Sequence, residues 1–62
     1  MLEYTKTVLQ KVSFNRELFS KELGKAFKWL HKEELILLQA WCVVTFSDTY
    51  HDVISEAFRN LS

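Results

Sequence analysis

The chain has 62 residues, no net charge at pH 7, one Gly and no Pro, and 48% of its residues are hydrophobic. These values exclude a collagen-like chain, a low-complexity linker and an intrinsically disordered protein, since such chains are rich in Gly or Pro or are poor in apolar residues. The length allows one small domain over residues 1–62, and a single cysteine excludes a disulfide within the chain.

A short helix is predicted at the start of the chain, where side chains that can form the buried face of a helix recur every three or four positions. The residues of this face are Leu2, Thr5, Val8, Leu9 and Val12. The segment Ser13-Phe14-Asn15 interrupts the pattern, so we expect a helix of about ten residues.

The second predicted helix begins after Asn15, a residue type that caps helix N-termini well. This start places Phe14 and Phe19 in the register of a hydrophobic staple. It also places Glu17 four residues before Lys21, which is the spacing of an ion pair on a helix surface.

The apolar face of this second helix consists of Phe19, Leu23, Ala26, Phe27 and Leu30. Gly24 lies inside the helix, and we expect it to let a neighbouring helix approach closely. The sign of the charges changes from Lys28 and Lys32 to Glu33 and Glu34, which predicts a break near His31. A continuous helix over residues 16–46 also satisfies the pattern.

The third predicted helix, residues 33–46, is apolar around almost its whole circumference, which is typical of a buried helix. A cap cluster at residues 47–49 follows, and Thr49 and Asp52 have capping-box spacing. The apolar face of the fourth helix consists of Tyr50, Val53, Ile54, Ala57, Phe58 and Leu61. The expected fold class is therefore all-α, a compact bundle of three to four short helices.

The size of the chain predicts a dimer. A core this small seldom contributes more than about 3–5 kcal/mol of stability, and no disulfide or metal site is available to add to it. A second copy would cover the side of the third helix that the other helices leave open. The candidates for this seam are Leu37, Leu38, Trp41 and Val44. Leu18 and Trp29, which lie off the apolar face of the second helix, form a second candidate edge.

Charge is distributed unevenly along the chain. Residues 1–32 hold seven Lys and Arg against three Glu, whereas residues 33–62 hold one Arg against five acidic residues. Four lysines of the first half fall within a stripe about 60° wide on the second helix, and they are Lys21, Lys25, Lys28 and Lys32. We expect a solvated face there. The alternatives are electrostatic pairing, within the chain or between copies, and a nucleic-acid or membrane surface with Trp29 as a stacking residue.

The residues that could support catalysis or metal binding form no convincing site. Cys42 lies in the most apolar segment, so we expect a small buried side chain rather than a nucleophile with His51 and Asp52. Neither His31 nor His51 has a second Cys or His at i+3 or i+4, which argues against zinc. Asp48, His51 and Asp52 could form a weak surface cation site, but a cap cluster explains them better. We therefore expect no enzymatic activity, metal or cofactor.

Three segments of the chain resemble short uncharacterised bacterial proteins that are all helical. These segments run from Leu2 to Leu9, from Phe19 to Leu30 and from Glu33 to Cys42. The resemblance implies a small cytoplasmic helical protein and brings no known activity.

The sequence favours a self-associating, non-enzymatic interaction module that binds a second copy or a different protein. The alternative is a small regulatory nucleic-acid-binding protein that uses the lysine stripe, although the zero net charge argues against it. We expect a cytoplasmic location with no membrane association, because no signal segment is visible and the longest apolar stretch, residues 35–46, is shorter than the roughly 20 residues of a bilayer span.

Overall fold

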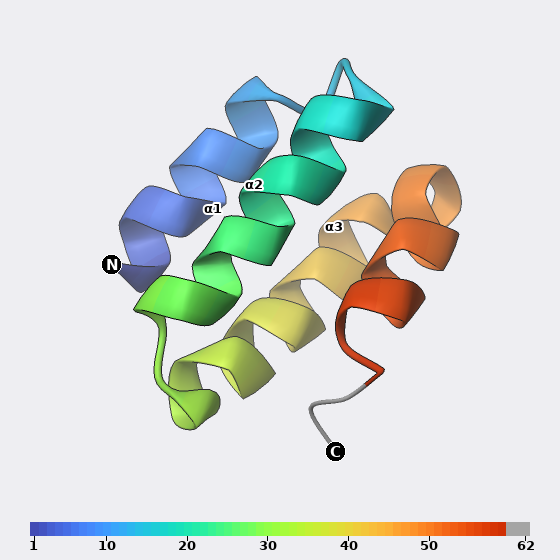
Figure 1. Ribbon diagram of the computed structural model, residues 1–62. Helices are drawn as coiled ribbons and strands as arrows, with labels where there is room; N and C mark the ends of the chain where they lie inside the picture. The colour runs from blue at the N-terminus through green and yellow to red at the C-terminus, as the bar shows by residue number, and fades with distance from the viewer. Residues whose placement is uncertain (60–62) are drawn as a thin grey trace.

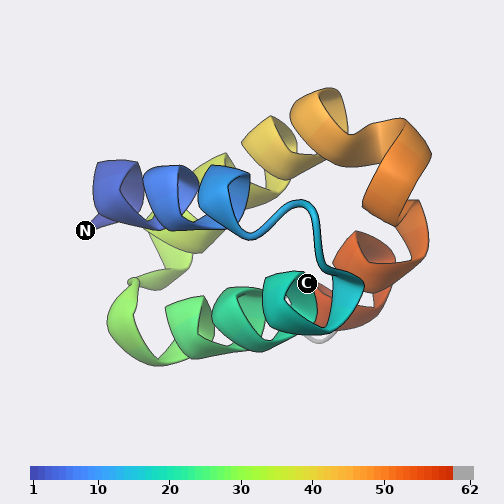
Figure 2. The same cartoon turned by 90° about the horizontal axis from the view of Figure 1, so that it is seen from above.

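The computed structural model describes residues 1–59, apart from the side chain of Ser47. Its helices are α1 (Leu2–Lys11), α2 (Arg16–Trp29) and α3 (Lys32–Ala57). α3 consists of two segments, because the backbone angles of Phe46 and Tyr50 are not helical and bend it between them. The four helical segments run alternately up and down and pack side by side as a bundle (Figures 1 and 2). The predicted all-α bundle is confirmed, whereas the structure of a single chain does not test the dimer.

The turn between α1 and α2 forms for the reason that the sequence suggests. The side-chain Oδ1 of Asn15 accepts a hydrogen bond from the backbone N–H of Leu18 at 3.1 Å, so the predicted N-cap is confirmed. The predicted staple is wrong, because the Phe14 side chain is 80% exposed. Phe19 packs instead against the aromatic rings of Phe46 and Tyr50 in the core.

The predicted break near His31 is confirmed. Leu30 and His31 have extended backbone angles, with ψ values of 146° and 163°, so α2 and α3 are not one continuous helix. The backbone N–H of His31 donates to Glu34 Oε1 at 3.1 Å, which satisfies a donor at the start of α3. Because the Glu34 carboxylate accepts this hydrogen bond, α3 can begin just before the acidic pair Glu33 and Glu34.

The predicted break after Phe46 is confirmed only in part. The backbone angles of Phe46 (φ −122°, ψ 21°) and Tyr50 (φ −127°, ψ 29°) are not helical, so two helical segments meet there across a kink within α3. Thr49 lies between these two non-helical residues, at the junction of the two segments, and its capping box with Asp52 stays a prediction. Leu61, the last residue of the predicted fourth helix, lies outside the described residues.

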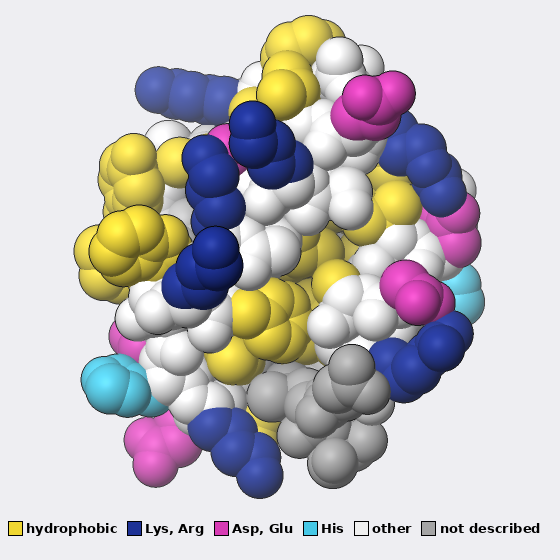
Figure 3. All heavy atoms as spheres, viewed as in Figure 1, with side chains coloured by type: hydrophobic (Ala, Val, Ile, Leu, Met, Phe, Trp, Pro, Cys, Tyr) yellow, Lys and Arg dark blue, Asp and Glu magenta, His cyan; other side chains and the backbone are white. Residues whose placement is uncertain are grey.

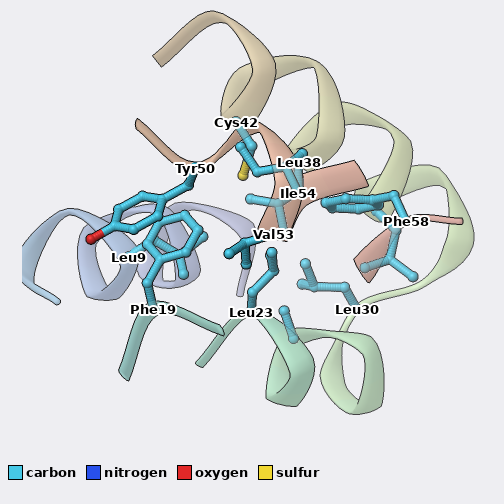
Figure 4. Close-up of a cluster of buried hydrophobic side chains, with 12 residues drawn as sticks. Leu9, Phe19, Leu23, Leu30, Leu38, Cys42, Tyr50, Val53, Ile54 and Phe58 are labelled. Atoms are coloured by element: carbon cyan, nitrogen blue, oxygen red, sulfur yellow. The ribbon is translucent and has the colours of Figure 1, made fainter. Parts of the chain in front are cut away.

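The core contains buried side chains from all four helical segments (Figure 4). The buried apolar residues are Leu9, Phe19, Leu23, Ala26, Leu30, Leu35, Leu38, Cys42, Tyr50, Val53, Ile54 and Phe58. The Phe19 ring stacks on Tyr50 with a centroid distance of 4.4 Å. The Tyr50 hydroxyl also donates a hydrogen bond to the backbone carbonyl of Ser13. These contacts hold the segment of α3 after the bend against α2 and the turn before it.

Among the described residues, one ion pair connects the basic and acidic halves of the chain. Arg16 in α2 pairs with Asp52 in α3, and the Arg16 guanidinium lowers the pKa of the Asp52 carboxyl by hydrogen bonding to it. The predicted pair of Glu17 with Lys21 is not among the ion pairs of the described residues. Both Arg16 and Asp52 are exposed, so this pair orients the two segments but adds little stability.

Gly24 does not serve as a point of close helix approach. No described atom outside its own helix and chain neighbours lies within 4 Å of the position that a Cβ would occupy. The expectation of a close contact there is therefore wrong, because α2 turns this position towards an open groove lined by residues of α2 and α3.

Replacing Gly24 with Ala is expected to stabilise the protein by roughly 0.5–1 kcal/mol, because Ala reduces the freedom of the unfolded chain and meets no clash in the helix. Urea unfolding followed by circular dichroism measures the change. An unchanged or lower midpoint would show that the groove at Gly24 is closed in solution.

Candidate interaction surfaces

Cys42 is buried in the core, where its thiol cannot reach a substrate. Its side chain has 0% exposure, and burial raises the pKa of the thiol to about 12. The thiol is therefore protonated at neutral pH and is shielded from reagents. His51 and Asp52 are exposed, so the structure does not bring them together with Cys42. The prediction of a small buried side chain at Cys42 is confirmed.

The thiol of Cys42 is expected to make stability fall at high pH. Its pKa rises from an ordinary value of 9.0 to about 12 in the folded state. Between these values the unfolded chain loses the thiol proton and the folded chain keeps it, so unfolding becomes more favourable as pH rises. Urea titrations of wild type and Cys42→Ala at pH 8 and about pH 10.5 isolate this contribution, since the two proteins differ only in the thiol. An equal loss of stability in the two proteins would contradict it.

The other candidate chemical residues lie apart from one another or on the surface. His31, at the start of α3, is exposed, as are Asp48 and His51 near its bend. Within residues 1–59, no three His, Cys, Asp or Glu side chains are placed so as to hold a metal ion.

The outer face of α3 exposes apolar side chains, where a surface helix usually carries polar ones. We define this outer α3 face by five exposed apolar residues, which are Ile36, Leu37, Ala40, Val43 and Val44. Helical geometry gathers them into a stripe about 120° wide and about 12 Å long. The stripe lies opposite Leu35, Leu38 and Cys42, which α3 presents to the core. α3 therefore has two apolar faces, of which the described part of the chain buries one.

The four predicted seam residues lie in three different environments. Leu37 and Val44 lie on the outer α3 face, and Val44 is 83% exposed. Leu38 is completely buried in the core of the single chain, so its assignment to an intermolecular seam is corrected. Trp41 is partly buried, and its ring packs edge-on against Phe46 at 5.5 Å. The sequence could not separate these residues, because α3 is apolar on both sides.

Residues that the sequence did not single out complete the outer α3 face. Ile36 and Val43 are half exposed, and Ala40 lies between them. Their spacing of i, i+4 and i+7 is the signal that could have found them, once the direction of the core is known.

A second apolar surface lies between the antiparallel helices α1 and α2. Trp29 is 63% exposed and Tyr4 is 66% exposed, one on each helix. They line a groove of about 310 Å³ together with Met1, Val8, Lys25 and Ala26, and we call it the α1–α2 groove. Trp29 was expected at such an edge, whereas Tyr4 and Met1 were not. Leu18, the other residue of the predicted edge, is 37% exposed but does not line the groove.

The four predicted lysines are all exposed. A row of basic side chains follows α2, and hydrophobic side chains gather beside it over α1 (Figure 3). Lys25 pairs with Glu22 at 3.3 Å and lies in the α1–α2 groove. The predicted single stripe is wrong in part, because Lys32 begins α3 beyond the break at His31 and Lys21 lines the open groove between α2 and α3. Lys25 is the lysine of the stripe that lines the α1–α2 groove.

Comparisons of the chain with protein-family models, curated proteins and solved structures find no match. Over residues 1–59, none of the helices combines the length and the apolar character that crossing a bilayer requires. The roles of the candidate surfaces are therefore inferred from the exposure, charge and packing of this chain's own residues.

Proposed function

We propose that this protein is a non-enzymatic interaction module that self-associates through the outer α3 face. The observation that supports this proposal is the apolar stripe opposite the core. Ile36, Leu37 and Val44 are at least half exposed although each is strongly apolar. A contiguous apolar face of this kind is typical of a surface that another chain covers.

A second copy suits this face because the face is self-complementary. Ala40 lies at its centre, with two larger apolar residues before it and two after it. A twofold contact centred on the face brings Ala40 of each copy together, and the small side chains let the two helices approach closely. The larger residues then pack on both sides of the contact.

The size of the chain sets the extent of such a contact. A standard interface takes about 800 Å² from each partner, and the accessible surface of this chain is 4348 Å². The dimer would therefore bury about a fifth of each surface. The outer α3 face would form its dry centre, and neighbouring polar side chains would form its rim.

Light scattering over a dilution series, at low and at high salt, tests this proposal. We expect the mass of a dimer at both salt concentrations, because apolar contacts are not screened by ions. A monomer at every concentration, up to near millimolar, would refute it. A dimer that dissociates only at high salt would instead indicate electrostatic pairing between the basic and acidic halves of two copies.

A further inference from the structure

We propose that the α1–α2 groove, with the lysines beside it, binds an acidic amphipathic helix of a partner protein. This inference does not depend on self-association, since the outer α3 face and the α1–α2 groove share no residue. A copy could engage both partners at once.

The shape of the groove fits a third helix. α1 and α2 lie antiparallel and adjacent (Figures 1 and 2), and their seam is open over a volume of about 310 Å³. Tyr4 and Trp29 border the seam from opposite helices, and more than half of each side chain is exposed. Tyr and Trp are enriched among the residues that anchor protein interfaces. A helix laid in the seam would place an apolar side chain between these two rings.

The lysines beside the groove favour a partner with acidic side chains. Lys25 lies in the groove, and Lys21 and Lys28 are exposed one turn away on the same helix. Among the described residues that line the groove, Glu22 is the acidic one, and Lys25 already pairs with it at 3.3 Å. Because Lys25 and Glu22 offset each other, the excess positive charge beside the groove comes from Lys28 and from Lys21, which also lines the open groove between α2 and α3. This charge complements Glu and Asp on the flank of a bound helix that faces these lysines.

The same features favour a protein segment over a polyanion. Nucleic-acid-binding domains are generally basic as a whole, whereas this chain has no net charge and its second half is acidic. The apolar lining of the groove also suits a side chain better than a phosphate.

A labelled model helix tests this inference. The probe is a fluorescein-labelled peptide of about 18 residues, long enough to form a helix, with Leu at i, i+3, i+4 and i+7 and with Glu and Ala elsewhere. Fluorescence anisotropy at low and physiological salt measures its binding to the full chain. Peptides of scrambled order, or with Lys in place of Glu, are the controls.

We expect the acidic amphipathic peptide to bind with a Kd that salt weakens, while both control peptides bind at least about tenfold less tightly. Trp29→Ala and Lys25→Glu should each weaken binding about tenfold or more. Leu37→Ala on the outer α3 face should leave binding unchanged. Lys6→Glu, the matched charge reversal at a lysine that lies over Trp41 instead of in the groove, should do so too.

Several outcomes would overturn the inference. They are the absence of binding, equal binding of the scrambled peptide, and unchanged binding to Trp29→Ala. Tighter binding to single-stranded DNA or to vesicles of anionic lipid, lost in Lys25→Glu, would assign the groove to a polyanion instead. Circular dichroism of each variant checks that it is folded, and Lys21→Glu provides a second charge reversal if Lys25→Glu is not.

Discussion

Phe19→Ala is expected to abolish cooperative folding at 25 °C or to remove at least about a third of the stability. The Phe19 side chain has 0% exposure, and it contacts Tyr50 and Phe46 with ring-centroid distances of 4.4 and 4.9 Å. Truncating a buried Phe to Ala costs about 3–5 kcal/mol, whereas a domain of this length is stable by only about 3–9 kcal/mol in total. Because Tyr50 and Phe46 flank the bend of α3, the cavity would also release the segment after it.

Urea unfolding followed by far-ultraviolet circular dichroism, at a fixed protein concentration, measures this effect. Phe14→Ala is the matched control, because it removes the same ring from a site that is 80% exposed. We expect the control to change the free energy of unfolding by no more than about 0.5 kcal/mol. Equal effects of the two substitutions would contradict the assignment of Phe19 to the core and of Phe14 to the surface.

Val44→Glu is expected to convert the proposed dimer into a folded monomer. Val44 is 83% exposed in the single chain, so a charge there meets water in the monomer and costs little stability. In the dimer the same carboxylate would be buried against apolar side chains of the second copy, and burial of an unpaired charge is strongly unfavourable. The variant should therefore have the mass of one chain and a helical content close to that of wild type.

Light scattering and circular dichroism of the same samples provide both measurements. Gln10→Glu is the control, since it adds the same charge at an exposed position of α1. Leu37→Glu, on the outer α3 face one turn from Ala40, should act like Val44→Glu. A dimer that survives both substitutions would place the interface elsewhere on the chain, whereas loss of helical content in both would show that the outer α3 face is needed for folding.

The candidate surfaces were accessible to sequence reasoning to different degrees. Trp29 was found because it points away from the apolar face of its own helix. Tyr4 was missed because its exposure depends on where α2 packs against α1, which no pattern in the first helix reveals. Leu38 was assigned to a seam because the third predicted helix is apolar on both sides. The exposed and the buried stripe can be told apart only when the neighbouring helices are in place.

The sequence by itself determined the helical class, the end of α1, the cap at Asn15 and the break at His31, because these features depend on side-chain spacing and on local hydrogen bonds within a few residues. The tertiary structure decided the rest. It turned Phe14 outward, left Gly24 facing an open groove, and packed α3 on both sides of its bend, where the Tyr50 hydroxyl donates to the Ser13 carbonyl across 37 positions of the chain. The physical reason is that the packing of neighbouring helices decides which side chains are buried. A helix with two apolar faces satisfies the same local rules whichever of its faces lies against the core.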